Sequence, residues 1–115
     1  MNIEEFRNYC LSKPAVTEEF PFDESTLVFK VAGKMFALTN VDDFQFINLK
    51  CDPDRAITLR EEYDSIRPGY HMSKKHWNSV YQEVGTKLIK ELIDHSFELV
   101  VESLPKQIRE DLSNY

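Results

Sequence analysis

The stretch that decides the fold is residues 25–40, STLVFKVAGKMFALTN. In its first half, Leu27 and Phe29 alternate with their neighbours in the two-residue period of a β-strand. Ala-Gly at 32–33 interrupts the pattern, and residues 34–39 then alternate again. Two alternating runs joined by a short turn that contains glycine predict a β-hairpin.

The second strand of this hairpin is expected to place Met35 and Ala37 on one face, with Phe36 and Leu38 on the other. Both faces of the hairpin are apolar. We therefore expect helices to cover one face, while the other face is partly protected.

Comparable patterns occur on both sides of the hairpin. Alternating apolar residues predict two more strands, at 42–50 and 76–82. Capping residues and apolar stripes predict helices that begin at Asn2, Asp52, Gly85 and Pro105. This order favours an α+β fold, in which an antiparallel sheet of hairpin-connected strands packs against N-terminal, middle and C-terminal helices. We expect residues 1–115 to form a single domain.

Composition limits the classes of function. The chain has 20 acidic and 14 basic residues, a net charge of −6, which argues against coating nucleic acid or an anionic membrane with the whole surface. No apolar run approaches the roughly 20 residues that span a bilayer, so we expect no membrane partner. The N-terminus lacks the basic region of a secretory signal. Two cysteines, Cys10 and Cys51, cannot form a dense disulfide framework, which points to a reducing cytoplasm.

No set of catalytic or metal-ligating residues stands out. The three glycines stand singly, which excludes a glycine-rich phosphate loop, and His71, His76 and His95 lack the usual spacing of zinc ligands. Cys51 directly precedes a helix start, where the dipole could lower a thiol pKa, but a small buried filler fits the same position. We therefore expect a protein that is not an enzyme and that has no metal and no cofactor.

Residues 65–82 are the longest window without an acidic residue, and they include PGYHMSKKHWNSV at 68–80. One interpretation is structural: Pro-Gly makes a turn, Trp77 supplies packing area, and the charged residues keep a loop in solvent. The other interpretation is a phosphate-binding patch, in which an exposed aromatic ring stacks on a base. That patch would be formed by Arg67, Lys74 and Lys75, with His71 or His76.

Three blocks carry a resemblance to a known family: PFDESTLVFKVAGKMFALTN at 21–40, PGYHMSKKHWNSV at 68–80 and LIKELIDHSFELVVESLPK at 88–106. In this order they resemble the MmcQ/YjbR family of small bacterial proteins. The resemblance implies a compact α+β fold, likened to a double wing, and binding to DNA. It places Lys30 and Lys34 beside the turn of a hairpin that acts as a wing, and it matches the family's lysine-bearing motif to residues 74–77.

The first functional expectation is a non-catalytic DNA-binding protein that contacts phosphates through a basic hairpin and loop. Its site residues would be Lys30, Lys34, Arg67, His71, Lys74, Lys75 and His76. The alternative is a protein-interaction or small-ligand module with an apolar groove near Tyr70, His71 and Trp77. An enzyme would require Cys51 or His71 exposed in a pocket beside a polarising partner.

Overall fold

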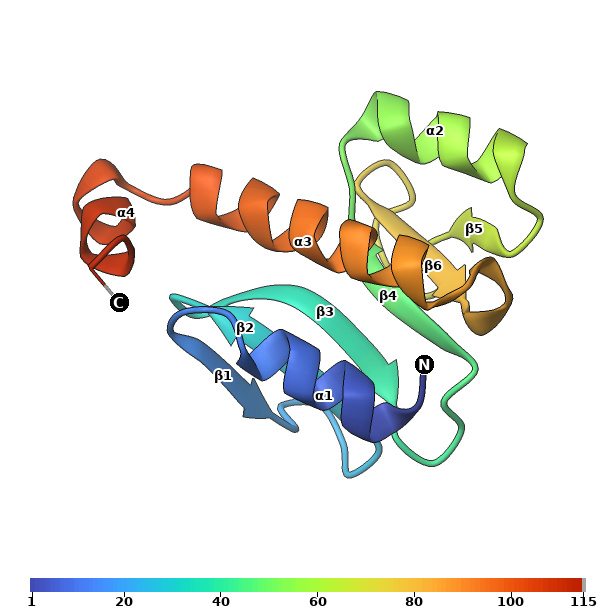
Figure 1. The fold of residues 1–115 in the computed structure, drawn as a ribbon, viewed down its shortest axis with the longest axis horizontal. Helices are drawn as coiled ribbons and strands as arrows, with labels where there is room; N and C mark the ends of the chain where they lie inside the picture. Colours follow the sequence, from blue (N-terminus) through green and yellow to red (C-terminus); the bar gives the residue numbers. More distant parts are fainter. Residues whose placement is uncertain (115) are drawn as a thin grey trace.

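The computed structural model describes residues 1–114. Within them, six strands form one antiparallel sheet in the order β1-β2-β3-β4-β6-β5 (Figure 1). The strands are β1 (Val16–Glu19), β2 (Thr26–Val31), β3 (Lys34–Asn40), β4 (Phe46–Lys50), β5 (Ile66–Pro68) and β6 (Trp77–Tyr81). The helices are α1 (Ile3–Leu11), α2 (Pro53–Glu62), α3 (Thr86–Glu102) and α4 (Lys106–Leu112), with a 3-10 turn, η1 (Gln82–Val84), before α3. The predicted α+β class is confirmed.

The predicted helix starts are confirmed. The Asn2 side chain accepts a hydrogen bond from the Glu5 N–H at 2.8 Å, and the Asp52 side chain accepts one from the Arg55 N–H at 3.1 Å. Each bond satisfies an amide that has no partner within the first helical turn. Gly85 precedes α3 with φ of 92°, a left-handed conformation that favours glycine.

The predicted hairpin is formed by β2 and β3. Ala32 and Gly33 connect the strands with φ of 49° and 78°. Two consecutive positive φ values are typical of a type I′ turn, whose twist matches that of the strands. Ala32 carries a Cβ in the left-handed region, which costs about 1–2 kcal/mol relative to a right-handed conformation.

The predicted faces of β3 are wrong, because β3 contains a bulge. Phe29 pairs with Ala37 and Lys30 pairs with Met35, so Phe36 is an extra residue in β3. Both Phe36 and Ala37 consequently belong to the main core, although they are adjacent in sequence. Leu38 and Met35 instead belong to a second cluster, on the other face of the sheet.

Two edge strands were not predicted, and one predicted strand is shorter than expected. β1 and β5 are only 4 and 3 residues long. Pro68 ends β5, and its missing N–H is tolerated at a sheet edge. The strand expected from residue 42 begins at Phe46, because the Asn40 side chain accepts hydrogen bonds from the N–H groups of Asp42 and Asp43 and forms a turn there.

Helices α1, α2 and α3 contribute to one core on a single face of the sheet (Figure 1). Its fully buried members include Phe6, Phe29, Ile47, Ile89 and Ile93. α4 lies beyond the C-terminal end of α3, at one end of the molecule (Figure 1). Across residues 1–114, no helix has the length and apolar character needed to cross a bilayer.

The sheet has a seam between β3 and β4, where α3 supplies a polar bridge. Only three residue pairs join these strands, from Ala37–Leu49 to Thr39–Ile47. Beyond them, the fully buried Ser96 hydroxyl donates a hydrogen bond to the carbonyl of Phe36 at 2.5 Å and accepts one from the N–H of Lys50 at 2.9 Å. One side chain therefore satisfies backbone groups of both strands where their direct pairing ends.

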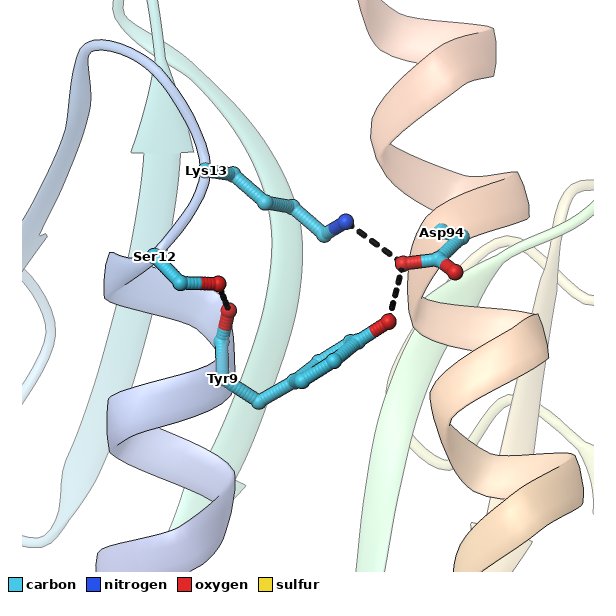
Figure 2. A network of polar contacts seen from close by, with 4 residues as sticks. All are labelled: Tyr9, Ser12, Lys13 and Asp94. Atoms are coloured by element: carbon cyan, nitrogen blue, oxygen red, sulfur yellow. Dashed lines mark hydrogen bonds and ion pairs between the residues drawn. The ribbon is translucent and has the colours of Figure 1, made fainter.

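A second polar link joins α1 to α3 (Figure 2). One carboxylate oxygen of Asp94 accepts hydrogen bonds from the Tyr9 hydroxyl at 2.7 Å and from the Lys13 ammonium at 2.5 Å. Burial raises the pKa of Tyr9 to about 12, and its bond to Asp94 adds to the effect. Burial alone would raise the pKa of Asp94 as well, but the bonds from Lys13 and Tyr9 outweigh it and hold this pKa below its usual value.

His95, the next residue of α3, contacts the start of α2. Its Nε2 accepts a hydrogen bond from the N–H of Asp52 at 3.1 Å, which requires the unprotonated ring nitrogen. Burial, and secondarily the positive charge of Arg55, lower the pKa of His95. The folded protein therefore holds this histidine neutral at a pH where the unfolded chain protonates it.

We predict that Ser96→Ala lowers the free energy of unfolding by about 1–3 kcal/mol, because it leaves the buried carbonyl of Phe36 and the partly buried N–H of Lys50 without a partner. Ser103→Ala is the matched control, since within residues 1–114 the Ser103 hydroxyl, at the end of α3, donates only to the nearby Val100 carbonyl. Urea denaturation measures both. Equal, small losses in the two variants would contradict the role given to Ser96.

We predict that Ala32→Asn raises the free energy of unfolding by about 0.5–1 kcal/mol, because asparagine tolerates the left-handed turn position better than alanine. Ala32→Val should instead destabilise the protein, since a β-branched residue is strained at positive φ. Thermal and urea unfolding test the pair. A change of the same sign in both variants would rule out the backbone explanation.

We predict that stability falls as the pH drops below about 6.5, the usual pKa of histidine in an unfolded chain. The unfolded state binds a proton there that His95 in the folded state resists. In His95→Gln this part of the pH dependence should disappear, whereas it should persist in His76→Gln, which alters an exposed loop residue. Unfolding in urea between pH 5 and 8 decides the point, and an unchanged slope in His95→Gln would refute it.

Candidate functional site

The face of the sheet opposite the helices is here called the open face. At one end it carries the second apolar cluster, in which Val28, Leu38 and Trp77 are buried and Met35 and Met72 are half-buried. Trp77 is only 8% exposed, so it packs in this cluster. Of the three residues near which the sequence suggested an apolar groove, Tyr70 and His71 line the pocket described below, whereas Trp77 does not.

The loop between β5 and β6 is held against the open face by its backbone. Ser79 and Asn48 are cross-strand neighbours, and the Ser79 hydroxyl donates to the Asn48 side-chain oxygen at 2.5 Å. Ser79 also accepts from the N–H of Tyr70 at 2.9 Å, and the Asn48 amide donates to the Tyr70 carbonyl at 3.1 Å. Both backbone groups of Tyr70 are thus bound to the sheet, which fixes where its side chain begins.

Gly69 allows this close approach. Its N–H donates to the Trp77 carbonyl at 2.9 Å, and a Cβ at position 69 would lie 2.8 Å from the Trp77 Cβ. Real Cβ atoms do not approach other carbons so closely. The Pro-Gly pair therefore serves both as a strand end and as a contact between loop and strand.

The rings of Tyr70 and His71, which belong to this loop, form an aromatic corner with the ring of Phe46. The Tyr70 ring is 59% exposed and stands nearly perpendicular to Phe46, with ring centroids 6.0 Å apart and an interplanar angle of 84°. His71 has φ of 58° and brings its ring centroid to 4.1 Å from that of Tyr70. On the other side, Phe46 packs on Tyr81 at 4.9 Å.

The aromatic corner forms one wall of a pocket of about 610 Å³. The rest of the apolar lining comes from Phe22, Leu38 and Met72, and Asp23 and Asp43 contribute carboxylates. The Asp23 carboxylate accepts from the N–H groups of Ser25 and Thr26 and from the Thr26 hydroxyl, and these bonds lower its pKa. The pocket combines exposed rings with negative charge.

Lysines gather at the end of the sheet that lies away from this pocket. Lys34 pairs with Val31 beside the hairpin turn, Lys50 pairs with Trp77, and the loop residues 74–76 directly precede that tryptophan. Since paired strands share their ends, all of these residues lie at one end of the sheet. We define the basic end as Lys30, Lys34, Lys50, Lys74, Lys75 and His76.

Two of the predicted site residues lie elsewhere. Arg67 is at the β5 edge, with its guanidinium carbon 4.6 Å from the centre of the Tyr81 ring, and His71 lines the pocket. Within the basic end, Lys30 forms an ion pair with Glu19, and the Lys74 ammonium donates to the Gly69 carbonyl at 3.3 Å. Lys34, Lys75 and His76 are exposed.

Sequence reasoning missed Lys50 and the lining of the pocket. The sequence shows only that Lys50 ends an alternating strand. It does not show that Lys50 lies beside Trp77, because that position depends on the pairing of β4 with β6. Phe22 and Asp23 lie outside the strands and reach the pocket only through the fold.

Thiol and metal chemistry find no support in the described residues. Cys51 is 4% exposed, and burial raises its pKa to about 11, the reverse of the shift that a dipole-activated thiol would show. Burial also raises the pKa of Cys10. Among residues 1–114, no three His, Cys, Asp or Glu side chains are arranged to hold a metal ion.

Comparisons with known proteins agree with this architecture. The family model described as YjbR matches residues 11–99. The Escherichia coli O157:H7 protein YbdF is 42% identical over 104 residues, covering 88% of this chain and 85% of its own. The Escherichia coli K12 protein YjbR is 31% identical over 112 residues, covering 95% of each chain.

Solved structures extend the likeness. The crystal structure of Deinococcus radiodurans protein DR2400, with a DUF419 domain, superposes with a TM-score of 0.92 at 38% identity, covering 97% of this chain and 88% of that one. A Pseudomonas syringae crystal structure gives a TM-score of 0.72 at 31% identity, covering 86% of this chain and 98% of that one. With most of its length matched in sequence and in fold, the chain belongs to the YjbR family.

Proposed function

We propose that this protein binds DNA through its basic end and catalyses no reaction there. The observation that supports the proposal is the difference in charge between the two ends of the sheet. In a chain of net charge −6, lysines from three separate segments stand at one end of the sheet. Carboxylates stand at the other end, where Thr26 pairs with Asn40 and where Asp23, Asp42 and Asp43 lie in the adjoining turns.

The dimensions of the basic end suit a phosphate backbone. From β2 to β6 the row crosses three strand spacings, about 15 Å at roughly 4.8 Å each. A row of this length reaches more than one phosphate of a strand. The β2–β3 turn would act as the projecting wing, and the loop before β6 would supply the second contact.

Lys34 and Lys75 are the best placed to contact phosphate. Both are exposed, and within residues 1–114 neither side chain forms a hydrogen bond or an ion pair. Binding would therefore break no internal contact of theirs. Lys30 would have to exchange Glu19 for a phosphate, which lowers its net contribution.

Such contacts orient the protein on DNA without reading its sequence. Each bound phosphate releases counterions, so the affinity should fall steeply with salt. The overall negative charge of the protein opposes binding mainly at low salt, because charges farther apart than about 10 Å are screened at 0.1 M. The balance favours weak, sequence-independent binding.

We predict that the double variant Lys34→Ala/Lys75→Ala binds labelled duplex DNA several-fold more weakly at 50 mM salt. Its plot of log K against log salt should be shallower by about 0.9 for each phosphate that the variant no longer neutralises. Fluorescence anisotropy at 50, 100 and 200 mM salt measures both quantities.

The control is Lys87→Ala/Lys106→Ala, which removes the same charge from exposed positions on α3 and α4. If both double variants lose affinity equally, only net charge matters and the basic end is not the docking surface. Absence of saturable binding by the unaltered protein at 50 mM salt would refute the proposal as a whole.

A further inference from the structure

The pocket beside Tyr70 has features that DNA binding does not use. Phe22 and Tyr70 are 64% and 59% exposed, although burial of large apolar rings is favourable. Both line the same 610 Å³ pocket. Exposed rings that meet at one concavity mark a binding site more often than rings scattered over a surface.

The pocket is held in shape by contacts of its own. The backbone of Tyr70 is fixed on both sides by Ser79 and Asn48, so its ring starts from a rigid point. His71 adopts a strained positive φ that keeps its ring against Tyr70. Asp23 is anchored by three hydrogen bonds from neighbouring residues. A preformed site loses little conformational entropy when a ligand binds.

The charge of the pocket selects the ligand. Its lining includes two carboxylates, Asp23 and Asp43, and no lysine or arginine. The carboxylate of Asp43 makes no hydrogen bond within residues 1–114, so its charge is available to a ligand. Phosphates and carboxylates would be repelled here, whereas a cation would be attracted.

We propose that this pocket binds a small organic cation, an ammonium group that carries an aromatic or aliphatic body. The perpendicular rings of Phe46 and Tyr70 offer a corner of the kind that holds alkylammonium groups by cation–π attraction. Asp43 supplies the counter-charge, and Phe22 and Met72 contact the apolar body. This site is separate from the basic end and does not depend on DNA binding.

The test uses benzyltrimethylammonium as the probe, with phenylacetate as the anionic counterpart and benzyl alcohol as the neutral one. Titration of the full chain, followed by 1H–15N correlation spectra, should give saturable shifts for the cation at the amides of Tyr70, His71 and Asp43, with millimolar affinity. Phenylacetate should give none there, and benzyl alcohol should bind more weakly.

Asp43→Asn should weaken binding of the cation by about three- to fivefold, the scale of an exposed charge pair. Tyr70→Ala should weaken it by about three- to tenfold, whereas Tyr70→Phe should retain it, because the ring makes the contact. Asp64→Asn and Tyr63→Ala, exposed positions outside the pocket, serve as matched controls and should bind as the unaltered chain does.

Three results would overturn the proposal: no saturable shifts with the cation, equal binding of all three probes, or shifts that map outside the pocket. The spectrum of each variant shows directly whether it is folded. Lys34→Ala/Lys75→Ala should bind the cation unchanged, so failure of DNA binding and failure of this site are told apart.

Discussion

The structure depends on how the sheet is closed at its seam. β3 and β4 pair over only three residues, and past that point the bulge at Phe36 and the end of β4 leave a buried carbonyl and a partly buried amide. Ser96 satisfies both with one hydroxyl. Since unpaired polar groups inside a core are costly, α3 in this position stabilises the joining of the halves β1-β2-β3 and β4-β6-β5 into one sheet.

The same seam sets the layout of the open face. The bulge turns Phe36 toward the helices and leaves Met35 and Leu38 on the other side, where they meet Trp77 of β6 and Met72 of the loop before it. That apolar contact, together with the hydrogen bonds that Asn48 and Ser79 form with the backbone of Tyr70, places the loop across the end of the sheet. Lysines 74 and 75 and the ring of Tyr70 take their positions from it. Helix packing on one face thus determines what the opposite face presents.

The sequence predicted the elements with strong local signals and missed the features that depend on pairing. Asn2, Asp52 and Gly85 mark helix starts through their own chemistry, and the Ala-Gly turn marks the hairpin. The bulge carries no local signal, because STLVFKVAGKMFALTN alternates in the same way whether or not residue 36 is paired. The candidate sites follow this division. Lysines beside the turn could be predicted as a patch, whereas Lys50 and the pocket appear only once β4 has been aligned with β6.

Charge separation between the two ends of the sheet would let an acidic chain present both of the proposed binding surfaces. Screening limits the reach of each charge to about 10 Å at 0.1 M salt, so a ligand at one end of the sheet would respond to its own neighbours more than to the net charge of −6. The basic end and the carboxylates of the pocket come from opposite ends of the same strands, as the pairing of Lys34 with Val31 and of Asn40 with Thr26 requires. Antiparallel pairing makes this arrangement stable, because a shift of register by one residue would turn the core side chains to the wrong face. The separation of the two charged regions is therefore maintained by the same packing that maintains the core.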